Sequence, residues 1–101
     1  MKFLALEVEN PNVSPDDFQP HLIPEARRVW ELYLEGTLRE IYFRADKTLA
    51  VLVLECDSVE QARAALDSLP LVKAGLVQFE IMPLVPYPGL ARLFADEVGA
   101  P

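Results

Sequence analysis

The chain has 101 residues, of which 51% are hydrophobic, and its formal net charge is −7 at pH 7. A chain of this length is expected to form one domain around a single core. Nucleic acids and anionic membranes both require a basic face, so the acidic composition predicts neither as a partner.

The first third of the chain predicts a strand followed by a kinked helical segment. Residues 2–8 are apolar and suit a buried strand. Ser14, with a proline directly after it, is typical of a helix start. Pro20 and Pro24 each remove a backbone donor, so we expect a short kinked turn and then a secure helix over residues 24–35.

A hairpin is expected after Gly36, which is placed to end that helix in a left-handed conformation. Residues 38–44 and 49–55 read as two strands joined by a four-residue loop. Tyr42 would then face Val51, and one face of the sheet would be covered by helices. The residues expected on this covered face are Arg39, Ile41, Phe43, Ala50, Leu52 and Leu54. Those expected on the open face are Leu38, Glu40, Tyr42, Arg44, Leu49, Val51 and Val53, with Phe3 and Ala5 beside them.

A second helix and a last strand complete the predicted domain. Ser58 is a candidate N-cap for a helix that ends at Pro70. Apolar and polar side chains alternate over residues 76–84, as is typical of a half-buried strand. The order predicts a ferredoxin-like α+β domain, βαββαβ, with a four-stranded antiparallel sheet. We expect a single domain over residues 1–101, with its core in 1–84 and a tail over 85–101 that contains a short helix.

Two helices can cover only one face of such a sheet. The open face would keep an apolar surface, and exposing it would favour association. A second copy packed on the same face would form a dimer of two sheets. We therefore expect a homodimer or a higher homo-oligomer.

Several short motifs resemble those of the muconolactone isomerase family, in the dimeric α+β barrel superfamily. They are Glu35-Gly36-Thr37, Arg39, Ser58-Val59-Glu60 and Leu69-Pro70-Leu71, spaced without a gap across most of residues 35–88. The resemblance implies a dimeric α+β barrel and an isomerase that acts on an unsaturated lactone. Glu40 and Lys47 stand where the resemblance implies histidines.

Side chains suited to moving a proton between carbons lie on the predicted open face. Glu40 is a candidate base, Tyr42 a candidate proton shuttle and Arg44 a candidate clamp for a substrate carboxylate. An alternative interpretation is that Glu40 and Arg44 form an ordinary ion pair at an oligomer interface.

His21, the single histidine, is the other candidate catalytic residue. It precedes Glu25 by four residues, and the two would form a dyad if the kinked segment covered a pocket over the sheet. The alternative is a histidine that faces solvent.

A pocket between sheet and helices would also need residues that bind a substrate. Arg39 could bind a ligand anion there, or could pair with a carboxylate of the protein. Trp30 and Phe43 could line the pocket, although aromatic residues at this spacing also form ordinary core.

The sequence predicts no metal site and no cofactor. It contains neither a cluster of cysteine and histidine residues nor a glycine-rich phosphate loop. The single cysteine, Cys56, cannot form an internal disulfide, and no secretory leader or long apolar run is evident, so we expect a cytoplasmic protein without membrane contact.

The functional hypothesis is therefore a cofactor-independent, muconolactone isomerase-like protein that acts on a small unsaturated lactone or carboxylate. Two alternatives remain at this point. One is a non-catalytic ligand-binding or assembly protein on the same barrel, and the other is a small cofactor-independent monooxygenase.

Overall fold

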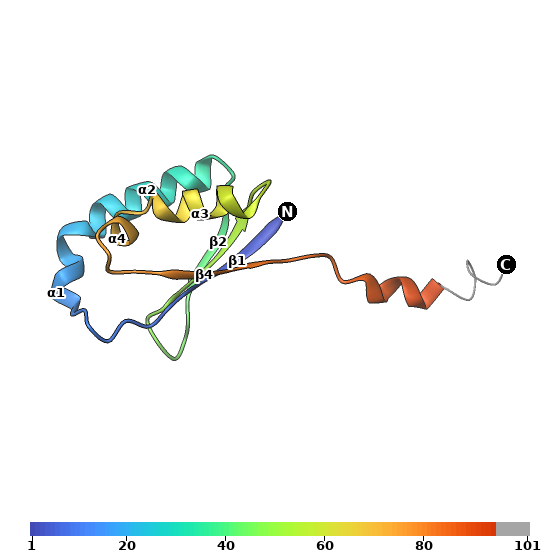
Figure 1. Cartoon of the computed structure of the whole chain (residues 1–101), viewed down its shortest axis with the longest axis horizontal. Helices are drawn as coiled ribbons and strands as arrows, with labels where there is room; N and C mark the ends of the chain where they lie inside the picture. The colour runs from blue at the N-terminus through green and yellow to red at the C-terminus, as the bar shows by residue number, and fades with distance from the viewer. Residues whose placement is uncertain (95–101) are drawn as a thin grey trace.

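The structure is a computed structural model that describes residues 1–94, so the last part of the predicted tail, residues 95–101, lies outside the described residues. The chain forms β1 (Lys2–Glu7), α1 (Pro15–Phe18), the 3₁₀ helix η1 (Gln19–His21), α2 (Leu22–Leu34), β2 (Leu38–Phe43), β3 (Ala50–Glu55), α3 (Val59–Asp67), α4 (Pro70–Lys73), β4 (Phe79–Pro83) and the 3₁₀ helix η2 (Pro88–Phe94). This order confirms the predicted βαββαβ arrangement. Helices α1 to α4 all lie on one side of the sheet (Figure 1).

The four strands form one antiparallel sheet, as predicted, and their order in the sheet is β2-β3-β1-β4. The two central strands are therefore β3 and β1, and β2 and β4 form the edges. A cleft opens beside β2, and the C-terminal arm leaves the domain from the end of β4 (Figure 1).

The predicted register of the hairpin is correct from Glu40 to Tyr42 and wrong before it. Glu40 pairs with Val53, but Leu38 pairs with Leu54, which leaves Arg39 as an extra residue in β2. Such a bulge reverses the alternation of side chains on one side of it. Leu38 is consequently buried in the core, with 1% of its surface exposed. Arg39, which was expected beneath the helices, is exposed instead.

The core lies between the sheet and the helices. Phe3 and Ala5 were expected on the open face, but they pair with Leu54 and Leu52 and are fully buried with them on the covered face. The reason is the register of β1, which the hairpin alone does not fix. The other buried side chains are those of Leu32, Leu38, Cys56, Ala62, Ala65, Leu66, Leu69, Leu71, Val77 and Phe79.

The helical segments around Pro20 and Pro24 can form because each proline lies in the first turn of a helix. A proline has no backbone N–H, and at these positions an N–H would have no intrahelical acceptor. Asp17 accepts a hydrogen bond from the backbone N–H of Ser14 at 2.8 Å and so closes the start of α1. Pro24 is the third residue of α2, within the first turn, whose N–H groups have no intrahelical acceptor. Helix α2 therefore begins two residues earlier than predicted. Gly36, with φ of 82°, ends it as expected.

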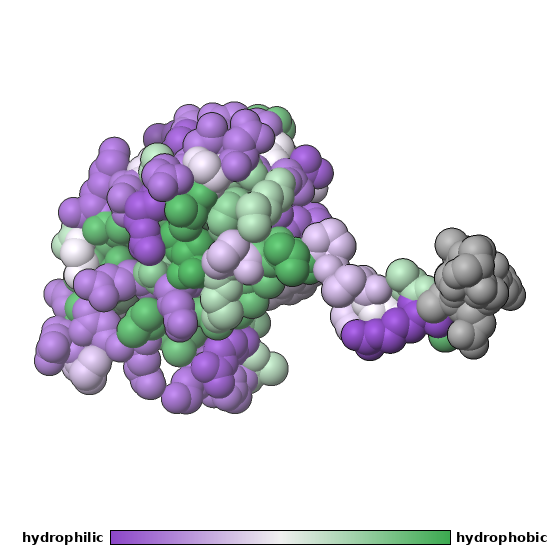
Figure 2. Space-filling model, turned by 45° about the vertical axis from the view of Figure 1, so that its right-hand side comes forward, coloured by the Kyte–Doolittle hydropathy of each residue, from purple (hydrophilic) through white to green (hydrophobic). Residues whose placement is uncertain are grey.

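The face of the sheet away from the helices remains open. Its centre carries five partly exposed apolar side chains, those of Leu4, Leu6, Val51, Val53 and Met82. Many other large apolar side chains are exposed, and Figure 2 shows one hydrophobic area framed by hydrophilic side chains. The arm that contains η2 extends away from the domain (Figure 1), and Val85, Tyr87, Leu90 and Leu93 on it are all more than half exposed. None of the described helices is long and apolar enough to cross a membrane.

Candidate active site

A cleft of about 620 Å³ lies between α2 and the covered face of the sheet. Cavities of this size can bury most of a small ligand. The lining comes from four strands and two helices, so the whole fold contributes to it. The lining residues are Glu7, Leu22, Glu25, Ala26, Val29, Trp30, Tyr33, Leu38, Ile41, Tyr42, Phe43, Ala50, Leu71, Val77 and Phe79.

Two half-buried carboxyl groups, those of Glu7 and Glu25, face this apolar cleft. Glu25 Oε1 accepts a hydrogen bond from the backbone N–H of Leu71 at 2.9 Å. Glu7 Oε1 accepts one from the backbone N–H of Ala50, also at 2.9 Å. Each carboxyl is thus fixed by one oxygen. The other oxygen accepts no hydrogen bond from the described residues.

The environment of Glu25 raises the pKa of its carboxyl group above the ordinary value. Burial is the largest cause, because it disfavours the charged form, and the nearby charge of Glu7 adds to it. The hydrogen bond from Leu71 and the charge of His21 act in the opposite direction. The carboxyl therefore holds its proton to a higher pH than an exposed glutamate. This property suits a group that must both accept and return a proton.

The local sequence explains why Glu25 occupies this position. It follows Pro24 in the first turn of α2, directly after the kinked segment that contains His21. Helix α4 begins at Pro70, and the N–H of the next residue, Leu71, lies in the first turn, where it has no intrahelical acceptor. Glu25 supplies the missing acceptor and joins α2 to α4.

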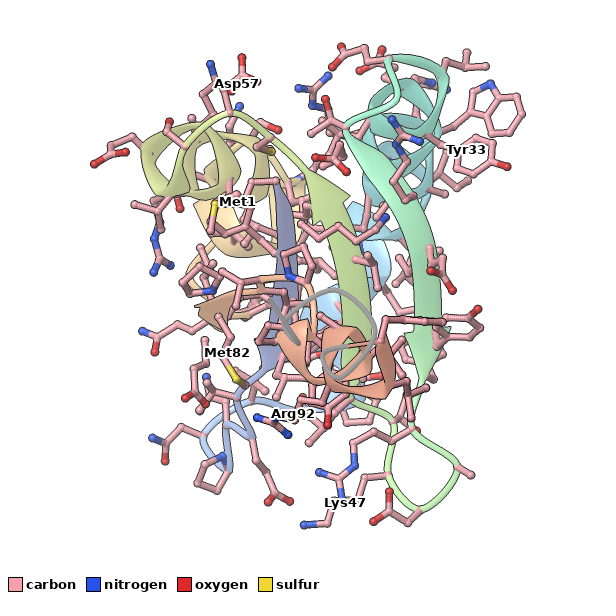
Figure 3. The ribbon with its side chains drawn as sticks, turned by 90° about the vertical axis from the view of Figure 1, so that its right-hand side faces the viewer. Met1, Tyr33, Lys47, Asp57, Met82 and Arg92 are labelled. Atoms are coloured by element: carbon pink, nitrogen blue, oxygen red, sulfur yellow. The ribbon has the colours of Figure 1, made fainter. Side chains whose placement is uncertain are left out.

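Aromatic side chains form the rim of the cleft beside β2. The rings of Trp30 and Tyr33 stack with centroids 5.7 Å apart and an angle of 14° between their planes. Trp30, Tyr33 and Phe43 are each more than half exposed although they line the cleft. In Figure 3, Tyr33 lies on the side of the molecule where β2 forms the sheet edge. The structure thus places Trp30 and Phe43 where the sequence located a pocket, and their role in binding stays a prediction.

The three candidates expected on the open face are only partly brought together, and one of them, Tyr42, lines the cleft instead. The Tyr42 hydroxyl donates a hydrogen bond to Glu40 Oε1 at 2.8 Å, and this bond raises the pKa of Tyr42. Arg44 does not pair with Glu40. It binds Asp46 through two hydrogen bonds of 2.9 and 2.6 Å, which lower the pKa of Asp46. The catalytic roles of Glu40 and Tyr42 and the clamping role of Arg44 stay predictions.

The remaining candidates, Arg39 and His21, lie outside the lining of the cleft. Arg39 Nε donates a hydrogen bond to the carbonyl of Gly36 at 2.7 Å, so its guanidinium is bound at the end of α2 rather than facing a cavity. The bulge is the reason. His21 is half-buried and close enough to Glu25 for its charge to lower the pKa of that carboxyl.

Glu7 is the functional candidate that sequence reasoning missed. It ends β1, and its pairing with Phe79 of β4 places it on the covered face. Glu25 had one sequence signal, its position four residues after His21 in the kinked segment. Among residues 1–94, no group of three or more histidine, cysteine, aspartate or glutamate side chains is arranged to hold a metal ion.

Comparison with known proteins identifies the fold. The sequence matches no protein-family model and no curated protein. Muconolactone isomerase is similar in structure, with a TM-score of 0.71 and 23% sequence identity over 87% of this chain and 92% of that one. The 5-chloro-2-hydroxyhydroquinone dehydrochlorinase from Burkholderia phenoliruptrix, in complex with 2,5-dihydroxybenzoquinone, has a TM-score of 0.67 and 16% identity over 88% of this chain and 98% of that one. The predicted resemblance is therefore confirmed at the level of structure, and the chain has the α+β fold of muconolactone isomerase.

Proposed function

We propose that the cleft is the active site of a cofactor-independent enzyme that moves a proton between two carbons of a small unsaturated lactone or related carbonyl compound. The observation that supports this most strongly is the Glu25 carboxyl, held in an apolar cleft with a raised pKa. The likeness in fold to muconolactone isomerase supports the same class of reaction.

In the proposed reaction Glu25 acts as both base and acid. Its carboxylate takes a proton from a carbon that the carbonyl group acidifies, which leaves a dienolate and a protonated Glu25. The same proton then returns to a different carbon of the conjugated system, and the carboxylate is restored. Tyr33 also lines the cleft, and its hydroxyl makes no hydrogen bond with the described residues, so it is available to donate to the enolate oxygen.

An absorbance assay tests the proposal, because moving a double bond into or out of conjugation changes ultraviolet absorbance. Wild-type protein should isomerise an unsaturated lactone, and Glu25→Gln should lose about 100-fold or more of kcat/KM. Glu60→Gln, an equivalent change on the exposed surface of α3, should retain full activity.

Glu40→Gln separates the two candidate bases. We expect this variant to keep most of the activity, because Glu40 lies outside the lining of the cleft. Loss of activity in Glu40→Gln together with normal activity in Glu25→Gln would instead assign the chemistry to the open face. If the wild type and the variants bind the lactone but none of them isomerises it, the alternative of a non-catalytic binding protein is supported.

We further propose that a second copy covers the open face of the sheet. The centre of this face carries five apolar side chains, those of Leu4, Leu6, Val51, Val53 and Met82. In a twofold-symmetric dimer this patch would pack against the same patch of the second copy. Light scattering coupled to size-exclusion chromatography should give at least twice the monomer mass of 11.3 kDa. A monomer at micromolar concentration would contradict this assembly.

A further inference from the structure

The charged residues of the cleft lining all carry the same sign. Glu7 and Glu25 are the two ionisable acids that line it, and no lysine or arginine is found among the described lining residues. The rest of the lining is aliphatic or aromatic except for the hydroxyls of Tyr33 and Tyr42.

Six of the nine lysine and arginine side chains contact other groups of the protein, and none of the nine lines the cleft. Arg44 and Lys47 pair with Asp46 and Glu9 at the hairpin loop. Arg28 is bound by Glu31 and Glu35 on the outer side of α2. The other contacts are those of Arg39 with the Gly36 carbonyl, Arg63 with the Phe79 carbonyl and Lys2 with Glu55. A ligand anion in the cleft would therefore find no lysine or arginine of residues 1–94 in the lining to pair with, and the charge of His21, which acts on Glu25, also comes from outside the lining.

Two effects would weaken the binding of an anionic ligand in this cleft. Its carboxylate would lose water without gaining a cation, which is unfavourable in an apolar site. It would also be repelled by Glu7 and by ionised Glu25. An uncharged ligand avoids both effects, and its flat conjugated ring can stack against the aromatic rim formed by Trp30, Tyr33 and Phe43.

We infer that the substrate of this cleft is an uncharged, flat, unsaturated carbonyl compound, and that the cleft selects against carboxylates. This inference rests on the proposed function, since proton transfer from carbon requires the carbonyl group. It narrows the class expected from the sequence, which included small carboxylates, to lactones and related neutral compounds.

Trp30 provides a direct test because it is the single tryptophan of the chain and lines the cleft. The probes are muconolactone, which carries a carboxylate at pH 7, and its uncharged methyl ester. Quenching of Trp30 fluorescence, repeated by calorimetry, gives a Kd for each. The ester should bind at least about tenfold more tightly, which exceeds the roughly fourfold gain that one extra methyl group provides.

Two variants test whether charge causes the preference for the ester. Glu7→Gln keeps an acceptor for the Ala50 N–H but removes a negative charge from the cleft, so it should narrow the ratio of the two Kd values. Glu60→Gln removes a charge outside the cleft and should leave the ratio unchanged. Equal binding of the two probes, tighter binding of the carboxylate or no binding of either would overturn the inference.

The result is distinguishable from failure of the proposed function. If the ester binds preferentially but no proton moves, the selectivity stands and the catalytic proposal fails. If protons move but the carboxylate is preferred, the catalytic proposal stands and the selectivity fails.

Discussion

The backbone N–H of Leu71 donates a hydrogen bond of 2.9 Å to Glu25 Oε1, which joins the first turn of α2 to the start of α4. This contact fixes one carboxyl oxygen, and the other accepts no hydrogen bond from the described residues. A single glutamate therefore links two helices and also presents a carboxyl with a raised pKa to an apolar cavity.

The stability of the fold should report the raised pKa of Glu25. Because the pKa is higher in the folded than in the unfolded chain, protonation of Glu25 favours folding below the unfolded value. This contribution is lost as the pH rises through the folded value. Glu25→Gln keeps an acceptor for Leu71 and cannot ionise. Urea unfolding between about pH 4 and pH 8 should show the variant gaining stability relative to wild type as the pH rises. A constant difference would contradict the raised pKa.

The pH dependence of kcat/KM should respond to both neighbours of Glu25. A base must be ionised in the free enzyme, so activity should rise with pH through the Glu25 pKa. Glu7→Gln removes a charge that raises this pKa and should move the acidic limb to lower pH. His21→Gln removes a charge that lowers it and should move the limb to higher pH. If neither variant shifts the acidic limb of the pH profile of kcat/KM, a group other than Glu25 determines that limb.

The bulge in β2 predicts very different effects for two adjacent substitutions. Leu38 is 1% exposed, so Leu38→Ala should lower the free energy of unfolding by about 2–5 kcal/mol. Arg39 is exposed and makes one hydrogen bond to a carbonyl, so Arg39→Ala should cost less than about 1 kcal/mol. Urea unfolding measures both. If Arg39→Ala lowered the free energy of unfolding more than Leu38→Ala, the bulge would be wrong and the regular register expected from the sequence would be correct.

The open face of the sheet should fail to assemble when it is charged. Val53 lies at its centre, paired with Leu4 and Glu40, and is half-buried in the isolated chain. Val53→Lys should shift the protein toward the monomer in light scattering, since a buried charge at an isologous interface is repeated in both copies. Ile23→Lys, which changes an exposed residue of α2, should leave the mass unchanged. Equal masses for wild type and both variants would contradict the proposed interface.

The order of the elements could be predicted because each has its own local signal. The alternation of the hairpin, the N-cap at Ser58 and the left-handed Gly36 are all read directly from neighbouring residues. The bulge could not be predicted, because one extra residue in a strand leaves the apolar pattern on either side intact. This single irregularity exchanged the expected places of Leu38 and Arg39.

The candidate site depended on relationships between distant segments. His21 and Glu25 were close in sequence, so their association could be considered in advance. Glu7 faces the cleft only because β1 pairs with β4 in one particular register and α2 crosses above it. No local pattern carries that information. The aromatic residues Trp30 and Phe43 were recognised as cavity candidates, whereas the absence of a cation from the described lining needed the full set of contacts.

Deuterium incorporation is the most direct test of the proposed role of Glu25, because it detects transfer of a proton to carbon even without net isomerisation. Wild-type protein in deuterium oxide should exchange the acidic carbon-bound hydrogen of an uncharged unsaturated lactone faster than buffer, as followed by proton NMR. Glu25→Gln should reduce the exchange to the buffer rate while Glu60→Gln leaves it unchanged. Undiminished exchange in Glu25→Gln, or no exchange above buffer in wild type, would contradict the proposed role of Glu25.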